Sequence, residues 1–339
     1  MPADVVVIGA GPAGLATAAM LQEDGRRVAL IDRASVGGAY ARMDPALVMT
    51  SPARLVGLPG LRFASDRPYA TAAAYHAYLV DYARAHRLVP LAADVSTVER
   101  DGRGYRVATT AGEILETDTV IAATGVFDHP VRPAIPGALT VPIVHARDWR
   151  VDQVAPGERV LIVGGASSAI EIAEACARAG CAVTLATRRV AIGRATVLGV
   201  DPAHALFPLL THISPRRFCD GRTTVPGVDR GFHALRRRGA ITVRSAPVWF
   251  DGDRACFAGG ASLAVDRVVL ATGYHFAAPC LPPDLERTPG GAPRCTDNES
   301  RSHPGLFVVG GPCARSAASQ YLYGIARDAQ ALARRIARR

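Results

Sequence analysis

Two stretches of the chain repeat one arrangement of a short apolar strand, a glycine-rich turn and a helix. Residues 5–14 read VVVIGAGPAG, and residues 160–169 read VLIVGGASSA. Such a turn has no room for a side chain at its first glycine. The helix that follows points its N-terminal amides and the positive end of its dipole at a phosphate. Each stretch therefore predicts a site for the pyrophosphate of a dinucleotide.

The first stretch has the complete glycine pattern. Gly9 makes the turn, Gly11 lets the backbone approach the phosphates, and Gly14 lets the helix pack on the sheet. The next expected strand, residues 27–31, closes on Asp32, and an acid there suits a free ribose 2′-OH. We therefore expect FAD in this site. A plain glycine-rich turn is the alternative, but it would not need Asp32.

The second stretch departs from the pattern. Ala166 replaces the second glycine, and Ala169 is an accepted variant at the third. Ser167 and Ser168 can donate to phosphate or cap the helix. The following strand closes on Thr187-Arg188-Arg189, and arginines there suit a 2′-phosphate, which predicts NADPH. Two alternatives stay open: the unit has lost its ligand, or the arginines are an ordinary solvated pair.

Length and composition narrow the class of protein. A chain of 339 residues predicts two domains, and it has neither an apolar stretch suited to spanning a membrane nor a signal peptide. A cytoplasmic location is the default expectation. The seven cysteines form no CxxC and the histidines no HExxH, so no metal site is expected. The net charge of +9 comes entirely from arginine, a bias more typical of genome composition than of a nucleic-acid partner.

The two halves of the chain share one design. Each has a nucleotide unit, an antiparallel meander and a strand that ends in Ala-Thr-Gly, at residues 119–125 and 268–273. The second meander is expected over residues 241–265. Another buried strand, 305–311, and a helix over 317–335 return to the first half. We therefore expect an α/β fold of two Rossmann-like, three-layer ββα domains. The FAD domain comprises residues 1–155 and 271–339, and the NADPH domain, residues 156–270, is inserted into it.

The chain resembles the flavoproteins with two dinucleotide-binding domains, which include thioredoxin reductases and flavin-containing monooxygenases, and it looks most like the small bacterial monooxygenases. The resemblance covers essentially the whole chain. It is carried by residues 37–40 (GGAY), by residues 47–52 (LVMTSP) before the flavin ring, and by ATGY ending at Tyr274. Residues 145–149 (HARDW) match the end of the FxGxxxHxxx(Y/F) signature, whose Phe and Gly are replaced here by Leu139 and Val141.

The resemblance and the motifs together assign candidate site residues. Those expected to bind FAD are Gly9, Gly11, Pro12, Ala13, Gly14, Asp32, Arg33, Gly38, Tyr40, Thr124, Gly125, Gly310, Gly311 and Ala317. Those expected to bind NADPH are Gly164, Gly165, Ser167, Ser168, Arg188, Arg189, Thr272 and Gly273. Met49, Ser51, Gln320 and Tyr321 are expected to line the substrate side, and the loops 54–69 and 197–230 are expected to form the substrate pocket.

Thr50 and His145 are the catalytic candidates. Thr50 stands where the family often has Asn or His, and it would donate a hydrogen bond near the reacting oxygen; a turn or packing role is the alternative. His145 is expected between the domains, where a structural role is favoured over proton transfer.

The resemblance implies an FAD-dependent NADPH oxidoreductase. As a monooxygenase, NADPH would reduce flavin, O2 would form a C4a-(hydro)peroxyflavin, and one oxygen would reach a heteroatom or carbonyl of a small molecule. The first alternative is a reductase or oxidase without a CxxC dithiol, which passes electrons to a quinone, a small disulfide, ferredoxin or O2. The second is a nucleotide sensor whose flavin NADPH cannot reduce. The expected partners are a small-molecule substrate and O2. A homodimer is a further possibility, and no binding to nucleic acid or to a membrane is expected.

Overall fold

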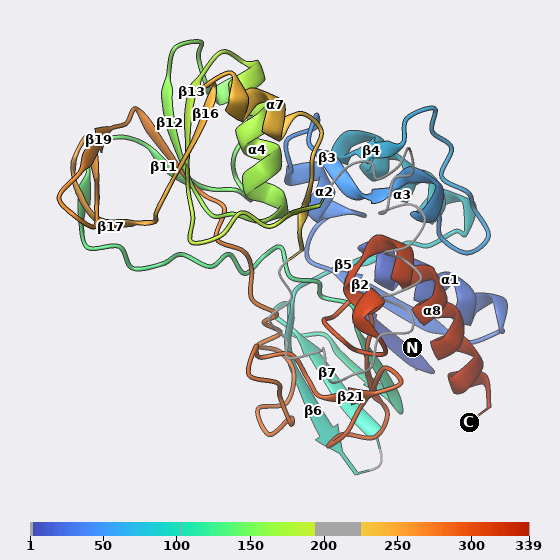
Figure 1. Ribbon diagram of the computed structural model, residues 1–339. Coiled ribbons are helices and arrows are strands. Elements are labelled where there is room, and N and C mark those ends of the chain that lie inside the picture. The colour runs from blue at the N-terminus through green and yellow to red at the C-terminus, as the bar shows by residue number, and fades with distance from the viewer. Residues whose placement is uncertain (1–2, 103, 194–224, 339) are drawn as a thin grey trace.

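The computed structural model describes residues 3–102, 104–193 and 225–338 (Figure 1). Two units, each built around a mainly parallel sheet, make up this part of the chain. The first unit takes its sheet from both ends of the chain, and the second takes its sheet from the middle. The second unit is therefore an insertion in the first.

The sheet of the first unit has seven strands in the order β21-β22-β23-β9-β1-β2-β5. β1, β2, β9 and β23 are parallel to one another, and Val5–Ile8 pair with residues of both β2 and β9. The bounds are β1 (Val5–Ile8), β2 (Val28–Asp32), β5 (Leu91–Ala92), β9 (Thr119–Ala122), β21 (Cys295–Thr296), β22 (Glu299–Ser300) and β23 (Leu306–Val308).

The side chains of β1 alternate between the two faces of the sheet, and each face is covered by other elements, so this unit has three layers. Val5 and Val7 join the core beneath the helices, whereas Val6 and Ile8 join the core beneath a β-meander. The helices are α1 (Pro12–Glu23), α3 (Ala72–Ala85) and α8 (Leu322–Ala337), and the meander strands are β6 (Val95–Asp101), β7 (Gly104–Thr109) and β8 (Ile114–Thr117). A fully apolar strand is expected when both faces of a sheet are covered.

The two ends of the chain meet where α8 packs on α1 (Figure 1). The inner face of α8 carries Leu322, Ile325, Ala329, Leu332 and Ile336 at helical spacing, all buried. α1 is lined with small residues, so the neighbouring helix can approach closely. This packing holds the C-terminal residues to the first unit although the second unit lies between them in the sequence.

The second unit repeats these layers. Its five-stranded parallel sheet has the order β11-β20-β12-β13-β16, with α4 on one face and a second meander on the other. The sheet strands are β11 (Ile143–His145), β12 (Arg159–Val163), β13 (Ala182–Ala186), β16 (Ile241–Arg244) and β20 (Arg267–Leu270). The helices are α4 (Ser167–Arg178) and α7 (Phe232–Arg237). The meander is β17 (Pro247–Gly252), β18 (Arg254–Phe257) and β19 (Ser262–Ala264), with β10 (Gly137–Leu139) beside β17.

Short elements fill the region where the units meet. The first unit contributes α2 (Gly38–Arg42), β3 (Val48–Pro52), the 3-10 turn η1 (Ala53–Leu55) and β4 (Tyr69–Thr71). The second contributes η2 (Val151–Gln153), β14 (Ile192–Gly193) and β15 (Gly227–Val228). β3 pairs with β4 and contacts α8, and β15 contacts α4. In Figure 1 the β3–β4 pair lies beside α4 and α7.

The predicted α/β architecture, with two three-layer units and one inserted in the other, is confirmed. Two details of the predicted elements differ. Residues 241–244 were expected to begin the second meander, but they pair in parallel with β13 and extend the main sheet. The bounds 1–155, 156–270 and 271–339 stay a prediction; β10 and β11 pair with strands of the second unit.

The expected helix over 317–335 is divided into two elements. Residues Ala317–Gln320 form a separate 3-10 turn, η4, and α8 begins only at Leu322. Ser316 and Ser319 close a reciprocal capping box around η4, and Tyr321 is extended, with φ −102° and ψ 149°, which interrupts the helix. Ala317 therefore does not begin the long helix. No helix in the described ranges is long and apolar enough to cross a membrane.

Candidate functional site

The first glycine of each fingerprint lies directly against the end of a neighbouring strand. A Cβ built on Gly9 would fall 2.4 Å from the carbonyl oxygen of Ala123, and one built on Gly164 would fall 2.2 Å from that of Ala271. Both glycines also have positive φ, +110° and +143°. Each alanine is the first residue of an Ala-Thr-Gly sequence, so the repeated motif and the repeated glycine turn are two sides of one contact.

The second glycine of the first fingerprint faces open space. Gly11 is the N-cap of α1, and a Cβ there would have no heavy atom of the described residues within 4 Å. Gly14, the third glycine of this fingerprint, is enclosed instead, because a Cβ there would fall 1.8 Å from the carbonyl oxygen of Gly9. Space at Gly11 beside a helix N-terminus is what a pyrophosphate requires, so the turn fits the predicted ligand.

Asp32 is held in place by the turn it faces. Its two carboxylate oxygens accept from the backbone N–H groups of Ala10, at 2.5 Å, and Ala34, at 2.7 Å. These contacts orient the carboxylate at the edge of the turn, and each oxygen keeps a lone pair for a ribose hydroxyl. Thr124 adds a buried hydroxyl oxygen that has no hydrogen-bond partner among the described residues. An unpartnered buried polar atom next to Gly9 fits a site that a ligand completes.

Residues from three parts of the chain surround this cradle. Gly310, with φ +73°, lies so close to α1 that a Cβ would be 2.9 Å from that of Ala13. Gly37 donates its N–H to the carbonyl of Ala10. The predicted FAD residues of the first fingerprint, of the Ala-Thr-Gly strand end and of the C-terminal turn are therefore brought together. Cys313, two residues after Gly311, takes part in a disulfide, which the spacing of the cysteines did not indicate.

Arg33 has an internal partner. Its guanidinium lies 2.6 Å from Asp128, and the other oxygen of that carboxylate accepts from Arg42 at 2.5 Å. Burial opposes ionisation of Asp128, but the two arginines outweigh it and hold the pKa of the carboxyl below its ordinary value. Arg33 therefore fixes the loop after β9 to the loop after β2. Its assignment to FAD stays a prediction.

The second fingerprint accepts an alanine without a change of geometry. Ala166 is the N-cap of α4 with extended backbone, as Gly11 is for α1. Gly165 is tightly enclosed, because a Cβ there would fall 2.2 Å from the carbonyl oxygen of Arg189. The turn after β13 is closed by the Thr187 hydroxyl, which donates to that same carbonyl at 2.8 Å. Arg188 and Arg189 are exposed beside the glycine turn, as a 2′-phosphate site requires.

Glu171 is an acid on the helix of the second fingerprint. Its carboxylate lies 3.4 Å from the guanidinium of Arg230 and accepts from the Ser167 hydroxyl at 3.3 Å. Burial raises the pKa of Glu171 to about 7, with Glu174 adding to the rise and Arg230 and Ser167 opposing it. The sequence offered one signal for this residue, a pair of glutamates at 171 and 174 on an otherwise apolar helix, and our sequence analysis missed it.

Two segments that join the units run side by side. The Thr272 hydroxyl donates to the carbonyl of Val131 at 2.5 Å, and Val131 donates its N–H to the carbonyl of Gly273. His145 lies here, fully buried, with Nδ1 accepting from the N–H of Arg147 and its ring 5.1 Å from that of Tyr274. Burial and the charge of Arg132 lower the pKa of His145. Burial therefore favours the neutral imidazole, and the histidine is built into the connection.

An aromatic cluster separates this connection from the first unit. The ring of Tyr40 lies 5.1 Å from that of Tyr75 and 6.2 Å from that of Phe127, which in turn lies 5.2 Å from Tyr274. Such edge-to-face rings pack favourably. Tyr40, which the sequence assigned to FAD, is therefore part of an aromatic wall, made of Tyr40, Phe127 and Tyr274, that joins the first unit to the connection.

The predicted substrate residues come from two elements that touch. Met49, Thr50 and Ser51 lie on β3, which contacts α8, and Gln320 and Tyr321 immediately precede that helix. Met49 and Thr50 are partly exposed, and Ser51 is buried. The described ends of the two predicted substrate loops also meet, because the guanidinium of Arg230 lies 4.5 Å from the ring centre of Tyr69. Residues 197–224 of the second loop lie outside the described residues.

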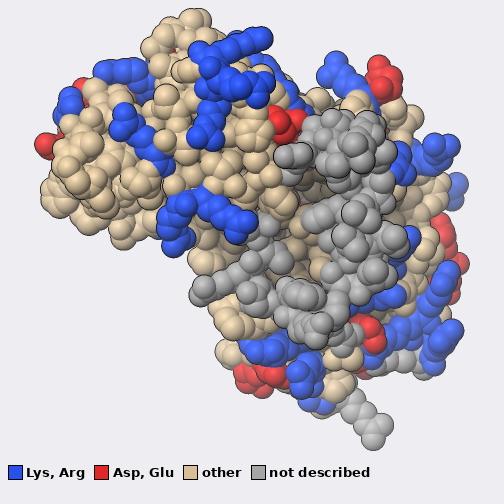
Figure 2. Space-filling model, viewed as in Figure 1, with Lys and Arg blue, Asp and Glu red and all other residues tan. Residues whose placement is uncertain are grey.

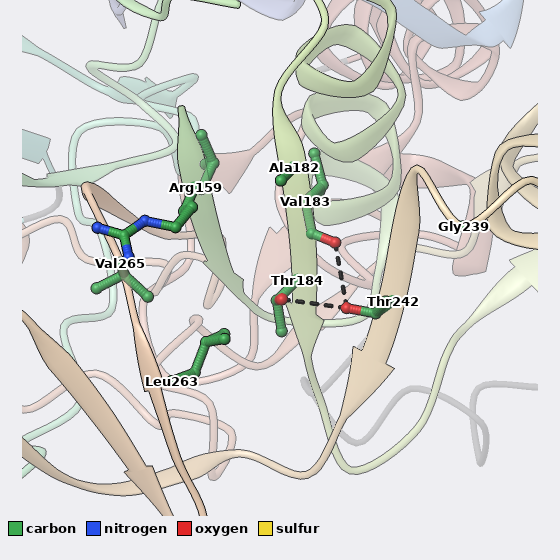
Figure 3. Close-up of a pocket in the computed structure, with 9 residues that line it drawn as sticks. Arg159, Ala182, Val183, Thr184, Gly239, Thr242, Leu263 and Val265 are labelled. Atoms are coloured by element: carbon green, nitrogen blue, oxygen red, sulfur yellow. Dashed lines mark hydrogen bonds between the residues drawn. The ribbon is translucent and has the colours of Figure 1, made fainter. Parts of the chain in front are cut away.

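Two other features of the described residues do not belong to this site. A cavity of about 110 Å³ is lined by Arg159, Ala182, Thr184, Gly239, Thr242 and Leu263 (Figure 3). It opens at the amino ends of β12, β13 and β16, whereas ligands of such sheets bind at the carboxyl ends. On the face that Figure 2 shows, the described arginines lie in several separate groups over both units.

Comparisons with known proteins agree with this geometry. The family model described as pyridine nucleotide-disulphide oxidoreductase matches residues 6–209. Probable indole-3-pyruvate monooxygenase YUCCA8 of Arabidopsis thaliana is 26% identical over 90% of this chain and 83% of its own length. A solved flavin-containing monooxygenase of Stenotrophomonas maltophilia is 27% identical, with a TM-score of 0.81 over 99% of this chain and 98% of the other. Bacillithiol disulfide reductase Bdr of Bacillus cereus, 20% identical with a TM-score of 0.77 over 100% and 99%, shares the fold.

The open space at Gly11 generates a prediction. Replacing Gly11 by Val adds a side chain where the pyrophosphate is expected but where the described protein atoms leave room. We expect the apoprotein to change its free energy of unfolding by less than about 1 kcal/mol, while bound flavin is largely lost. Gly9→Ala is the contrast, since its Cβ meets the Ala123 carbonyl and destabilises the fold as well. Flavin content and denaturant unfolding measure both effects; full flavin in Gly11→Val would contradict the assignment.

The raised pKa of Glu171 predicts a pH-dependent stability. The folded chain keeps a proton on Glu171 up to about pH 7, whereas the unfolded chain loses it near 4.5. This group therefore costs stability progressively as pH rises between those values, by about 3 kcal/mol in total. Glu171→Gln removes that loss, so its stability relative to the parent should improve between pH 4.5 and 7. Denaturant unfolding at several pH values tests this, and parallel pH curves for the two proteins would refute it.

Proposed function

The chain belongs to the pyridine nucleotide-disulphide oxidoreductase family, and we propose that it is an FAD-dependent NADPH monooxygenase acting on a small molecule. One observation carries the proposal. The two glycine cradles are built alike but end differently, with the oriented carboxylate of Asp32 beside one and the exposed Arg188 and Arg189 beside the other. This pairing fits FAD and NADPH bound together. The flavin monooxygenases among the similar proteins support the same pair of cofactors.

Bound FAD and NADPH supply hydride transfer and oxygen activation, and this chain's residues hold and shield them. Gly11 and the start of α1 would take the pyrophosphate of FAD, with Asp32 on its ribose. Ser167 and the start of α4 would take that of NADPH. The aromatic wall of Tyr40, Phe127 and Tyr274 would help to shield the flavin from water.

The substrate side is proposed to lie between β3 and the start of α8. Thr50 on β3 would donate its hydroxyl toward the reacting oxygen, and Met49 would provide an apolar surface. His145 has no place in this step, because it is fully buried in the connection between the units. We assign it a structural role. A heteroatom or carbonyl compound is the proposed substrate, and one similar protein is named as acting on indole-3-pyruvate. The homodimer and the cytoplasmic location stay predictions.

Isotope labelling tests the monooxygenase proposal. Under ¹⁸O2 with NADPH, we expect each molecule of product to carry one ¹⁸O, with NADPH consumed in equal amount and little peroxide released. Amines, sulfides and α-keto acids are the first compounds to screen. NADPH consumption matched by peroxide, or by reduction of a quinone or disulfide, with no label in any product would favour the oxidase or reductase alternative. A bound flavin that NADPH cannot reduce would indicate a sensor.

The coenzyme preference tests the arginine pair separately. Replacing both Arg188 and Arg189 by Ala should raise KM for NADPH at least about tenfold and leave KM for NADH nearly unchanged, because only NADPH carries the 2′-phosphate. Arg236→Ala with Arg237→Ala, on α7, is the control for a general loss of positive charge. Equal effects on the two coenzymes would mean that the pair is an ordinary solvated one.

A further inference from the structure

Arg230 is attached to the second unit by its backbone. Its N–H donates to a carboxylate oxygen of Glu174 at 3.0 Å, and the same oxygen accepts from the N–H of Phe232, the first residue of α7. Glu174 is itself buried on α4. The backbone of Arg230 is therefore fixed against the helix whose N-terminus is proposed to hold the phosphates of NADPH.

The side chain of Arg230 reaches into the first unit. Nη2 donates to the backbone carbonyl of Met49 on β3 at 2.7 Å, and the guanidinium lies 4.5 Å from the ring centre of Tyr69 on β4. Its other terminal nitrogen, Nη1, stays with the carboxylate of Glu171 on α4 at 3.4 Å. One guanidinium thus contacts an acid of the second unit and a carbonyl of the first.

Burial makes this contact significant. The side chains of Arg230 and Glu171 are only 18% and 8% exposed, so little water competes for the hydrogen bond between them, and the ionised form of Glu171 adds a charge attraction that is little screened. The chain of contacts continues to Ser167 in the first turn of α4, whose hydroxyl donates to Glu171. An unbroken series of polar contacts therefore runs from the proposed phosphate site to Met49, beside the catalytic candidate Thr50.

We propose that the Glu171–Arg230 pair is a clasp that positions the NADPH unit over the substrate face of the flavin unit. Arg230 is a positioning residue: its planar fork contacts Glu171 and Met49 at once while its face stacks on Tyr69, a combination that a lysine cannot reproduce. The clasp rests on the proposed function, because it matters for catalysis only if a hydride passes between the two nucleotides. Without the clasp, the second unit would still bind NADPH but would hold it at the wrong position relative to the flavin.

The chain offers a matched control. Arg267 and Glu158 form another ion pair at 2.7 Å, with side chains 17% and 13% exposed, and the same guanidinium donates to the carbonyl of Gln153. This pair has the same residue types and similar burial, but it lies beside the amino ends of β12 and β20 and contacts η2 instead of β3. Its loss should disturb local stability to a similar degree while the contacts of Arg230 with β3 and β4 remain in place.

The first experiment is anaerobic reduction of the bound flavin by increasing NADPH. In Arg230→Gln the limiting rate should fall at least about tenfold, whereas the apparent Kd for NADPH should change less than about threefold, because positioning and not binding is lost. Arg230→Lys should recover only part of the rate, and Glu171→Gln should also slow it. Arg267→Gln should keep a limiting rate within about twofold of the parent. Equal slowing in Arg267→Gln and Arg230→Gln would overturn the proposal.

The second experiment needs no nucleotide and separates the two hypotheses. Hydrogen exchange should be faster in peptides covering β3 and β4 in Arg230→Gln than in the parent, and unchanged there in Arg267→Gln. If NADPH does not reduce the parent's flavin, the proposed function fails, and hydrogen exchange still decides whether the clasp exists. If the parent is reduced but neither the rate nor the exchange responds to Arg230→Gln or Glu171→Gln, the clasp is refuted and the proposed function stands. Should Arg230→Gln not fold, Arg230→Lys and Glu171→Gln give the same comparison.

Discussion

The position of each nucleotide cradle depends on the contact between a glycine turn and a carbonyl group of a neighbouring strand. At Gly9 and again at Gly164, the chain passes so close to an alanine carbonyl that no side chain fits, and the helix that follows is thereby directed with its N-terminus at the edge of the sheet. A substitution there would move the helix, and with it the backbone amides on which a phosphate depends. Because both turns rest on an Ala-Thr-Gly segment, each segment both supports a turn and leads the chain out of its unit, so nucleotide binding and the connection between the units share the same residues.

The region between the units is unusually rich in charged and aromatic contacts. Asp128 holds Arg33 and Arg42, Asp44 accepts from the backbone of Val151 across the connection, and Arg230 reaches β3 from the second unit. A wall of edge-to-face rings fills the space behind them. This arrangement suits a flavoenzyme whose nicotinamide unit must be held at a defined position while water is kept out. Buried ion pairs contribute little net stability in many proteins, so the role proposed for the Glu171–Arg230 pair is to specify one arrangement of the two units.

Much of the fold could be predicted because its signals are local. The apolar strands 5–8 and 160–163, the glycine turns and the Ala-Thr-Gly strand ends depend on residues adjacent in sequence, and the repeat of one design predicted the insertion. Where the structure differed, a distant or finer interaction decided. Residues 241–244 look like a meander strand, but β13 offered a free parallel edge. The helix expected from 317 is interrupted at Tyr321, because Ser316 and Ser319 cap a separate short turn. Periodicity does not reveal such a break.

The sequence by itself determined the two glycine cradles, since the glycines, Asp32 and the arginines at 188 and 189 each lie in a short stretch of chain whose geometry is fixed by sterics and hydrogen bonding. Only the tertiary structure decided which residues join the two units. Glu171 and Arg230 lie 59 positions apart in the sequence, and Met49 lies in the other unit; nothing in the spacing of the three residues predicts that they meet. Their contact depends on how two sheets, two helices and two loops pack, and packing joins residues regardless of their distance along the chain.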